Sequence, residues 1–235
     1  MRDLSKYEVM KPNFAIETTE ELAPHHKILT IEPLVQGYGH TLGNALRRTL
    51  MSSLPGTAIT TVKFRDANHH YSTVKSLRNN LQEVMLNLKQ VIVSSSTDDE
   101  GILRLNVKGP KTVTAADIEC STGFEIINSD QFIVDIVNNT NFEIEMKVET
   151  NTGYLAIPYG QATTVGEIMV DAIFSPVIDV SYKVGDAQVG RQTDYDKLIM
   201  DIKTNGSITP EEALDQAARI LAAQFTRVFE PIICK

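Results

Sequence analysis

Three glycines, Gly37, Gly39 and Gly43, stand at the start of a predicted helix, where they could hold a phosphate group. A probable strand, residues 27–32, precedes them, so the order strand, glycine-rich turn and helix is that of a nucleotide-binding unit. Asp66 lies about 20 residues further on, where such a unit places the acid that binds a ribose hydroxyl. One hypothesis is therefore a nucleotide-dependent enzyme that uses residues 37–43 as a phosphate-binding turn.

Three features of the sequence weigh against this hypothesis. The glycine spacing is G-x-G-x-x-x-G in place of G-x-G-x-x-G, and the preceding strand is half polar with Pro33 near its end. The later chain alternates between apolar and polar residues, whereas the parallel sheets of nucleotide-binding folds are built from continuously apolar strands. A simple turn followed by a surface helix explains the glycines as well.

Other groupings that could bind a metal ion have unfavourable geometry. Asp194 and Asp196 have the spacing of a metal site, but no third ligand is near in the sequence, so we expect a solvated turn. The histidine pairs at 25–26 and 69–70 place neighbouring rings on different sides of a strand, and Cys120 is close to neither pair in the sequence. No serine-hydrolase, P-loop or zinc-protease motif occurs. We expect no catalytic residue, metal or cofactor in this chain.

The helix that follows the glycines has an apolar and a polar side. At about 100° per residue, one side carries Leu42, Ala45, Leu46, Thr49 and Leu50. The other side carries Asn44, Arg47, Arg48 and Met51. Two adjacent arginines beside an outward methionine indicate a contact surface.

The sequence Thr209-Pro210-Glu211-Glu212 predicts the start of a second long helix, with Thr209 as the N-cap and Glu212 closing a capping box. We expect this helix to end near Phe229, because Pro231 cannot continue it. Its apolar arc is wider than one packing partner needs, so one flank is expected to pack on its own sheet and the other on a second subunit. The alternative is a helix packed wholly within its own domain. The arc comprises Ala213, Leu214, Ala217, Ala218, Ile220, Leu221, Phe225 and Val228.

The chain between the two helices alternates like antiparallel sheet. Residues 103–107 form one such strand, and residues 142–148 form another with one wet face. We expect residues 132–137 to pair with this second strand as a hairpin across the asparagine-rich segment 138–141. Ser76 is expected to cap a short helix, and residues 98–101 to form a solvated turn. Further strands are expected at 180–184 and 198–202.

Composition limits the class of protein. The chain has 235 residues and 42% hydrophobic content, which suits one large or two modest domains. Its formal net charge of −8 makes it a poor binder of polyanions, since affinity for nucleic acid depends on cationic groups. Two cysteines cannot form a disulfide framework, and no apolar run has the length of a membrane span or signal peptide. We expect a cytoplasmic protein that binds neither membranes nor, through this region, DNA.

The run from Gly37 to Ser53 resembles the first helix of the bacterial RNA polymerase α subunit, whose pattern is G-x-G-H-T-L-G-N-A-L-R-R. Further segments that resemble this family follow in order at 86–89, 113–118, 170–172, 175–177, 191–198 and 204–213, and so cover nearly the whole chain. The resemblance implies an α+β fold with a dimerisation domain built from both chain ends, residues 1–55 and 177–235. This domain would contain two main helices and an antiparallel sheet, and residues 56–176 would form an inserted, mostly β domain.

The resemblance also implies a function, that of an assembly scaffold for DNA-dependent RNA polymerase. An α dimer would recruit the β-type and β′-type catalytic subunits, and catalysis with its magnesium would belong to those large partners of the nucleotidyltransferase complex. The positions that match the family's β-type contact are Arg48 and Met51, where the family usually has Leu at the second position. Those that match the β′-type contact are Lys89, Val170 and Lys197. The expected dimer contacts are Leu42, Leu46, Leu50, Leu214, Ala217, Leu221 and Phe225.

Two departures from the family pattern affect the expected partners. Residues 76–80, Ser-Leu-Arg-Asn-Asn, replace an acidic pair at the start of the middle helix, and the family's loop after Tyr154 is shortened to residues 160–164. The helix that would bind the β-type subunit is nearly intact, so the changes fall unevenly between the two expected surfaces. We therefore hypothesise that the chain pairs either with itself or with a second, non-identical α chain.

Overall fold

The computed structural model describes residues 15–65, 77–97, 100–157, 166–189 and 192–233. The chain divides into two compact units: unit 1 is Met1–Leu54 with Val177–Lys235, and unit 2 is Pro55–Pro176. Both units combine helices with antiparallel strands, which confirms the α+β class. Several positions discussed above lie outside the described residues, namely Asp66, His69, His70, Ser76, residues 98–99 and residues 160–164.

Unit 1 contains a four-stranded antiparallel sheet with the strand order β1-β2-β15-β14. The two central strands come from opposite ends of the chain, and their register pairs Ile31 with Leu198. The strands expected at 27–32, 180–184 and 198–202 all lie within this sheet. Its members are β1 (Ala15–Ala23), β2 (His26–Val35), β14 (Val177–Val189) and β15 (Gln192–Thr204).

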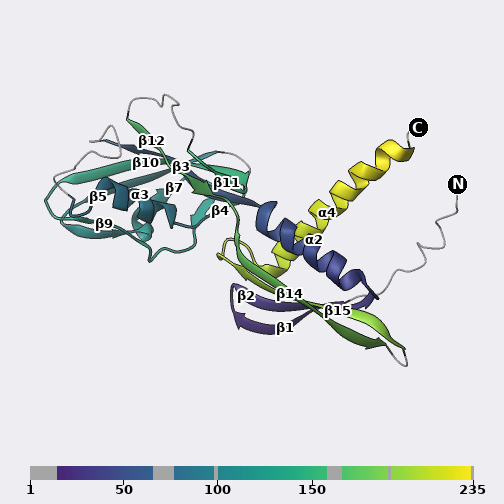
Figure 1. Ribbon diagram of the computed structural model, residues 1–235. Helices are drawn as coiled ribbons and strands as arrows, with labels where there is room; N and C mark the ends of the chain where they lie inside the picture. Colours follow the sequence, from purple (N-terminus) through teal and green to yellow (C-terminus); the bar gives the residue numbers. More distant parts are fainter. Residues whose placement is uncertain (1–14, 66–76, 98–99, 158–165, 190–191, 234–235) are drawn as a thin grey trace. The chain divides into compact units, whose positions relative to one another are not determined.

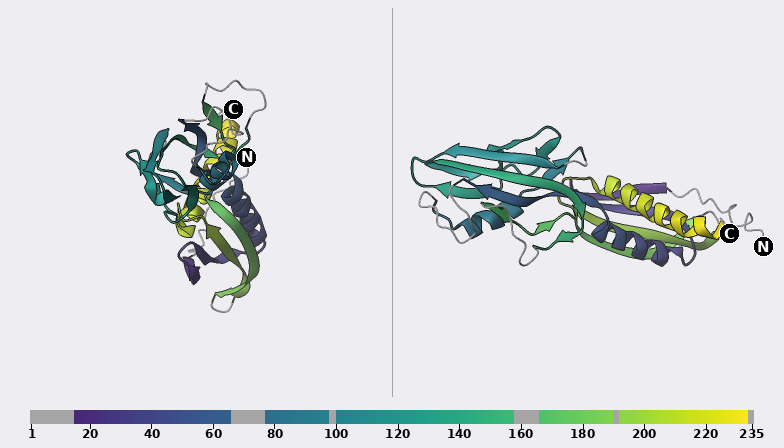
Figure 2. Two further views of the ribbon diagram at one scale, coloured as in Figure 1. Left: turned by 90° about the vertical axis from the view of Figure 1, so that its left-hand side faces the viewer. Right: turned by 90° about the horizontal axis from the view of Figure 1, so that it is seen from above.

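Two helices, α2 (Tyr38–Ser52) and α4 (Pro210–Ile233), lie side by side over one face of this sheet (Figures 1 and 2). The alternation of β2 and β15 turns one set of apolar side chains toward the helices, where they form a continuous core. The most deeply buried members of this core are Leu29, Leu50, Leu198, Met200, Ile202, Ala213 and Ala217, each with no exposed surface.

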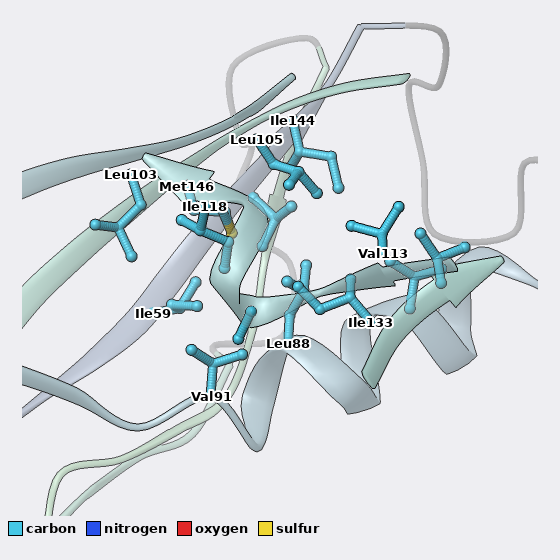
Figure 3. Packing of buried hydrophobic residues seen from close by; sticks show 14 of the residues in the cluster. Ile59, Leu88, Val91, Leu103, Leu105, Val113, Ile118, Ile133, Ile144 and Met146 are labelled. Atoms are coloured by element: carbon cyan, nitrogen blue, oxygen red, sulfur yellow. The ribbon is translucent and has the colours of Figure 1, made fainter. Parts of the chain in front are cut away.

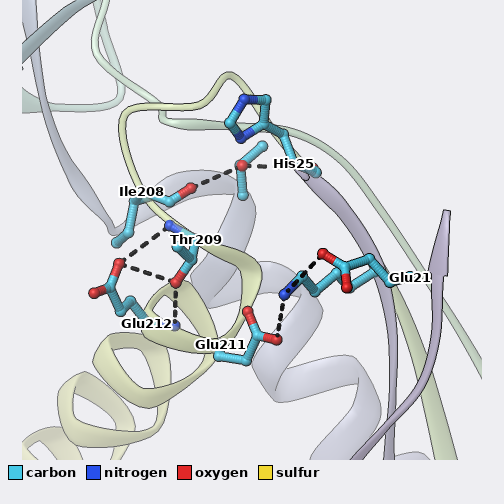
Figure 4. A network of polar contacts seen from close by, with 8 residues as sticks. Glu21, His25, Ile208, Thr209, Glu211 and Glu212 are labelled. Carbon is cyan, nitrogen blue, oxygen red and sulfur yellow. Dashed lines mark hydrogen bonds and ion pairs between the residues drawn. The ribbon is translucent and has the colours of Figure 1, made fainter. Parts of the chain in front are cut away.

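The start of α4 is held by the predicted capping box (Figure 4). The Thr209 hydroxyl accepts a hydrogen bond from the Glu212 amide at 3.3 Å, and the Glu212 carboxylate accepts one from the Thr209 amide at 3.2 Å. Lys27 of β2 lies 3.0 Å from Glu211 and 3.4 Å from Glu21. Hydrogen bonding to Glu211 raises the pKa of Lys27. The helix N-terminus is thereby joined to the sheet.

The predicted end of α4 near Phe229 is wrong, because the helix continues through Pro231 to Ile233. A proline cannot donate to the carbonyl four residues before it. In a last turn this loss affects only one hydrogen bond, so the backbone keeps its helical course past the ring.

Unit 2 is built on a seven-stranded sheet with the order β7-β5-β10-β3-β4-β8, and β12 also pairs with β3. Its strands are β3 (Pro55–Phe64), β4 (Val93–Ser95), β5 (Gly101–Lys108), β7 (Ile118–Cys120), β8 (Phe124–Ile126), β10 (Asn141–Thr152) and β12 (Glu167–Met169). Two small sheets pair β6 (Lys111–Thr114) with β9 (Phe132–Ile136), and β11 (Tyr154–Leu155) with β13 (Ala172–Ile173). One helix, α3 (Leu81–Lys89), and a short 3-10 turn, Ala115–Asp117, complete the described part of the unit.

The core of unit 2 lies between the large sheet and a layer made of α3, β6 and β9. Figure 3 shows side chains of both layers, such as Leu105 and Ile144 on one side and Leu88 and Ile133 on the other, pointing into the same apolar interior. All four of these side chains are essentially fully buried. The wet face of the large sheet carries charged cross-strand pairs, including Arg104 with Glu145.

Two local predictions for unit 2 are wrong. Strand β9 does not form a hairpin with β10, because β9 pairs with β6 in a separate sheet while β10 pairs with β3 and β5. The N-cap position of α3 is Asn80, four residues after Ser76. The alternation predicted for residues 103–107 is confirmed, since β5 alternates between buried and exposed residues along its whole length.

Candidate functional site

Helix α2 presents a polar surface on the side away from the core. Leu46 and Leu50 are buried, whereas Arg48 is exposed and Met51 is 39% exposed. The amphipathic pattern predicted from the sequence is confirmed. A cationic side chain that can donate several oriented hydrogen bonds therefore stands beside an apolar one, an arrangement suited to contact with another protein.

The glycines of α2 let the helix lie directly on strands β14 and β15. A Cβ atom on Gly43 would lie 2.6 Å from the ring of Tyr182 and 2.9 Å from a methyl carbon of Leu198. A Cβ atom on Gly39 would lie 2.7 Å from Val184. All three distances are shorter than atomic contacts allow, so these two positions need glycine for close packing.

The glycine-rich turn is occupied by a side chain of the same protein. The amides of Gly37 and Gly39 both donate to Oδ2 of Asp196, each at 2.9 Å. A phosphate on these amides would have to displace the carboxylate and lie against its negative charge, so the geometry argues against the nucleotide hypothesis. The prediction of a solvated turn is wrong for Asp196, which is half-buried within β15.

The expected dimer contacts fall into two groups. Four of them are buried in the core of unit 1, where they pack the helices on the sheet and cannot contact a second subunit: Leu46, Leu50, Leu214 and Ala217. Ala213, another member of the apolar arc of α4, is buried too. Leu42 and Leu221 are half-buried, and Phe225 is 69% exposed. Only the last three of the expected residues keep surface for a partner.

The distal part of α4 carries an apolar stripe that the described chain covers only at its first residue, Leu221. Leu221, Phe225 and Val228 follow one another at intervals of four and three residues, so they share one side of the helix. Val228 is 67% exposed, nearly as much as Phe225. We call these three residues the α4 stripe.

In unit 2 the structure brings Lys89 close to Asp171, next to Val170. The Lys89 ammonium forms an ion pair with Asp171 Oδ2, which also accepts a hydrogen bond of 2.9 Å from the Tyr154 hydroxyl. Hydrogen bonding to Lys89 lowers the pKa of Asp171, and hydrogen bonding to Asp171 raises the pKa of Tyr154. Val170 is itself buried, as a member of the core of unit 2.

Lys197 stands in unit 1, where it pairs with Glu32 of β2 at 3.2 Å. Because side chains alternate along a strand, Lys197 lies on the opposite face of the sheet from its neighbour Asp196. The three positions expected to contact the β′-type subunit are thus divided between the units, with Lys89 and Val170 in unit 2 and Lys197 in unit 1.

The remaining polar groups of the described residues do not form a metal site. His26 lies 2.6 Å from Asp201, and His25 is exposed. In the part of the chain that the structure describes, no three His, Cys, Asp or Glu side chains come together as metal ligands. None of the described helices is long and apolar enough to cross a membrane.

Comparison with known proteins identifies the family. Residues 32–225 match the family described as the RNA polymerase Rpb3/Rpb11 dimerisation domain. The chain is 42% identical over 205 residues to proteins named DNA-directed RNA polymerase subunit alpha from two cyanobacteria, Synechococcus sp. and Synechococcus elongatus. Each alignment covers 86% of this chain and 65% of the relative, so the chain spans about two thirds of the length of these relatives. The sequence motifs, the α+β fold and these matches together show that the chain belongs to the family of bacterial RNA polymerase α subunits.

Proposed function

We propose that the chain is an assembly subunit of DNA-dependent RNA polymerase, which dimerises and recruits the large catalytic subunits. In this proposal unit 1 is the dimerisation domain, unit 2 is inserted into it, and the catalytic residues and magnesium belong to the large partners. The relatives named above and the dimerisation family support this role.

The observation that carries the proposal is the α4 stripe. Phe225 and Val228 are each about two thirds exposed on one side of a helix whose first half is fixed in the core. Burial of apolar surface contributes roughly 25 cal/mol per Å², so covering two such side chains favours association. In a symmetric dimer one helix from each chain meets the same helix of the other, and a single stripe supplies both sides.

The contact with the β-type subunit is assigned to Arg48 and Met51, because both are exposed on the outer side of α2. The contact with the β′-type subunit is assigned to Lys89 and Lys197 among the three positions expected from the sequence, because Val170 is buried. Both lysines have partly exposed side chains with acidic neighbours. A partner carboxylate would compete with those neighbours for the two ammonium groups.

Dimerisation is tested by size-exclusion chromatography with light scattering. The wild-type chain is expected to be a dimer at micromolar concentration, and Phe225→Asp is expected to shift it to monomer because a charge would be buried in the apolar contact. Ala223→Asp is the matched control, since Ala223 is exposed on the same helix at about 160° from Phe225. It should leave the dimer intact.

A wild-type monomer, or equal effects of the two aspartate substitutions, would contradict the proposal. Intact-mass analysis of polymerase from the native source distinguishes the two kinds of dimer. One α mass that matches this chain indicates a homodimer, whereas two α masses in equal amounts indicate pairing with a second α chain.

A further inference from the structure

Helix α2 has no cap of its own. Its N-cap residue is Gly37, with a φ of 85°, which has no side chain to accept from the first amides. The first turn also contains no acidic residue. The first amides of a helix lack partners within the helix and carry a partial positive charge, so they need an acceptor that is preferably anionic.

Asp196 supplies that acceptor from a strand far away in the sequence. Its Oδ2 atom accepts from the amides of Gly37 and Gly39, 159 and 157 residues earlier in the chain. The same end of α2 is packed closely on the sheet, because the ring of His40 meets the ring of Tyr182 edge-on at 6.2 Å. One carboxylate therefore both caps α2 and ties its N-terminus to β15.

We propose that Asp196 is a positioning residue, whose carboxylate fixes where α2 presents Arg48 to the β-type subunit. Arg48 lies nine residues beyond Gly39, or about 14 Å along the helix at 1.5 Å per residue. A small slide or rotation at the tied end therefore displaces the guanidinium, whose oriented hydrogen bonds tolerate little misalignment. This inference rests on the function proposed above.

The capping role and the positioning role of Asp196 can be separated. An acidic residue within the first turn of α2 also stabilises the helix N-terminus, but it cannot tie the helix to β15. Tyr38 is suitable for this purpose, because it is the first residue of α2 and is 57% exposed. The double variant Asp196→Ala/Tyr38→Glu therefore restores the favourable charge without restoring the connection to the strand.

The experiment measures three properties of the full chain: thermal unfolding, affinity for the isolated β-type subunit, and hydrogen exchange of the Gly39 amide. Asp196→Ala is expected to lower the melting temperature, as follows from the loss of a charged helix cap, to weaken the affinity about tenfold through misplacement of Arg48, and to speed exchange at Gly39. The double variant should regain the melting temperature but not the affinity. Asp179→Ala is the matched control, because Asp179 is an exposed aspartate on β14 that does not lie opposite Asp196 in the sheet register. It should change none of the three.

Recovery of both stability and affinity in the double variant would show that Asp196 is only a cap and would overturn the inference. Wild-type affinity in Asp196→Ala would overturn it as well. If the wild-type chain itself fails to bind the β-type subunit, the proposed function fails, and the exchange measurement still decides whether Asp196 holds α2. Unchanged exchange of the Gly39 amide in Asp196→Ala would then show that the Asp196 carboxylate does not hold the N-terminus of α2 on β15.

Discussion

Arg48 is the residue on which the proposed contact with the β-type subunit depends most. It is exposed on α2, opposite Leu46 and Leu50, so its side chain plays no part in the core of unit 1. Arg48→Ala is expected to leave the α dimer intact and to weaken recruitment of the β-type subunit about 30-fold, which corresponds to roughly 2 kcal/mol for a buried interface arginine. Co-purification with a tagged chain measures the recruitment.

Arg104→Ala removes the same charge from an exposed position on unit 2 and serves as the control for Arg48→Ala. Complete polymerase recovered in normal yield with Arg48→Ala would show that this arginine does not anchor the contact.

Asp171 gives a prediction about pH. Its pKa is lowered in the folded chain, chiefly by the hydrogen bond from Lys89 and to a smaller extent by Tyr154. A carboxyl whose folded-state pKa is depressed stabilises the fold above its unfolded value of about 3.9, and this contribution is lost as the pH falls through the folded-state pKa. Lys89→Met is therefore expected to raise the pKa of Asp171 and to move acid unfolding of unit 2 to higher pH.

Carbon-13 NMR titration of the Asp171 carboxyl tests this expectation. Tyr154→Phe should raise the pKa by less than Lys89→Met, and the exposed control Lys108→Met should leave it unchanged. An equal rise in Lys89→Met and Lys108→Met would mean that net charge, and not the local pair, sets the pKa.

For single residues, the sequence predicts exposure that depends on the period of one helix. It does not predict contacts between side chains and backbone groups from two distant segments. The outward position of Arg48 follows from the helical period alone, and it is confirmed. Asp196 was predicted to lie in a solvated turn, because nothing near it in the sequence indicates that the amides of Gly37 and Gly39 will meet it. Only the pairing of β2 with β15 brings them together.

At the scale of elements, the contact of α2 with the sheet makes Gly43 a sharp test of packing. Alanine favours helix over glycine by about 1 kcal/mol. Gly43→Ala is nevertheless expected to destabilise unit 1 by about 1–3 kcal/mol, because the new Cβ would meet Tyr182 at 2.6 Å and Leu198 at 2.9 Å. Urea unfolding measures the difference.

Gly185→Ala is the control for Gly43→Ala, since a Cβ atom there would meet nothing within 4 Å. If Gly43→Ala proves as stable as the wild-type chain, α2 can move away from the sheet at little cost. The double variant Gly43→Ala/Tyr182→Leu should regain part of the lost stability by making room for the methyl group.

Elements defined by local signals were predictable, and those defined by choice of partner were not. The capping box at Thr209 and the alternation of β5 are local, and both are confirmed. The hairpin predicted from residues 132–148 is wrong because four residues after β9 can connect to the adjacent strand or to another sheet. The preference of β9 for β6 arises from packing over α3, which no local pattern encodes.

At the scale of the whole molecule, the charge predicts how the chain behaves toward DNA. Its formal net charge is −8, and unlike a DNA-binding domain it shows no basic stripe in the sequence. We expect this chain alone to bind duplex DNA weakly and without sequence preference, because few phosphate counterions would be released. A gel-shift assay at moderate salt tests this, and specific nanomolar binding would contradict a role limited to assembly.

The composition of unit 1 from two separate segments has a consequence for synthesis on the ribosome. Helix α2 emerges before Pro55–Pro176, whereas β14, β15 and α4 emerge after it. At a synthesis rate of about 5–20 residues per second, β15, which carries the capping residue Asp196, is made on the order of ten seconds after α2. During this interval the apolar face of α2 has no core to join.

Folding of unit 2 makes it easier for the two segments of unit 1 to find each other. Its first and last strands meet, since a Cβ on Gly56 would lie 1.8 Å from the carbonyl oxygen of Phe174. Once unit 2 has folded, the chain leaves it close to where it entered, and the loop that separates α2 from β14 shrinks from more than a hundred residues to a few. With about 0.6 kcal/mol for each halving of loop length, this removes about 3 kcal/mol of closure entropy. Folding of unit 2 thus brings the two sequence segments of unit 1 close to one another during biosynthesis.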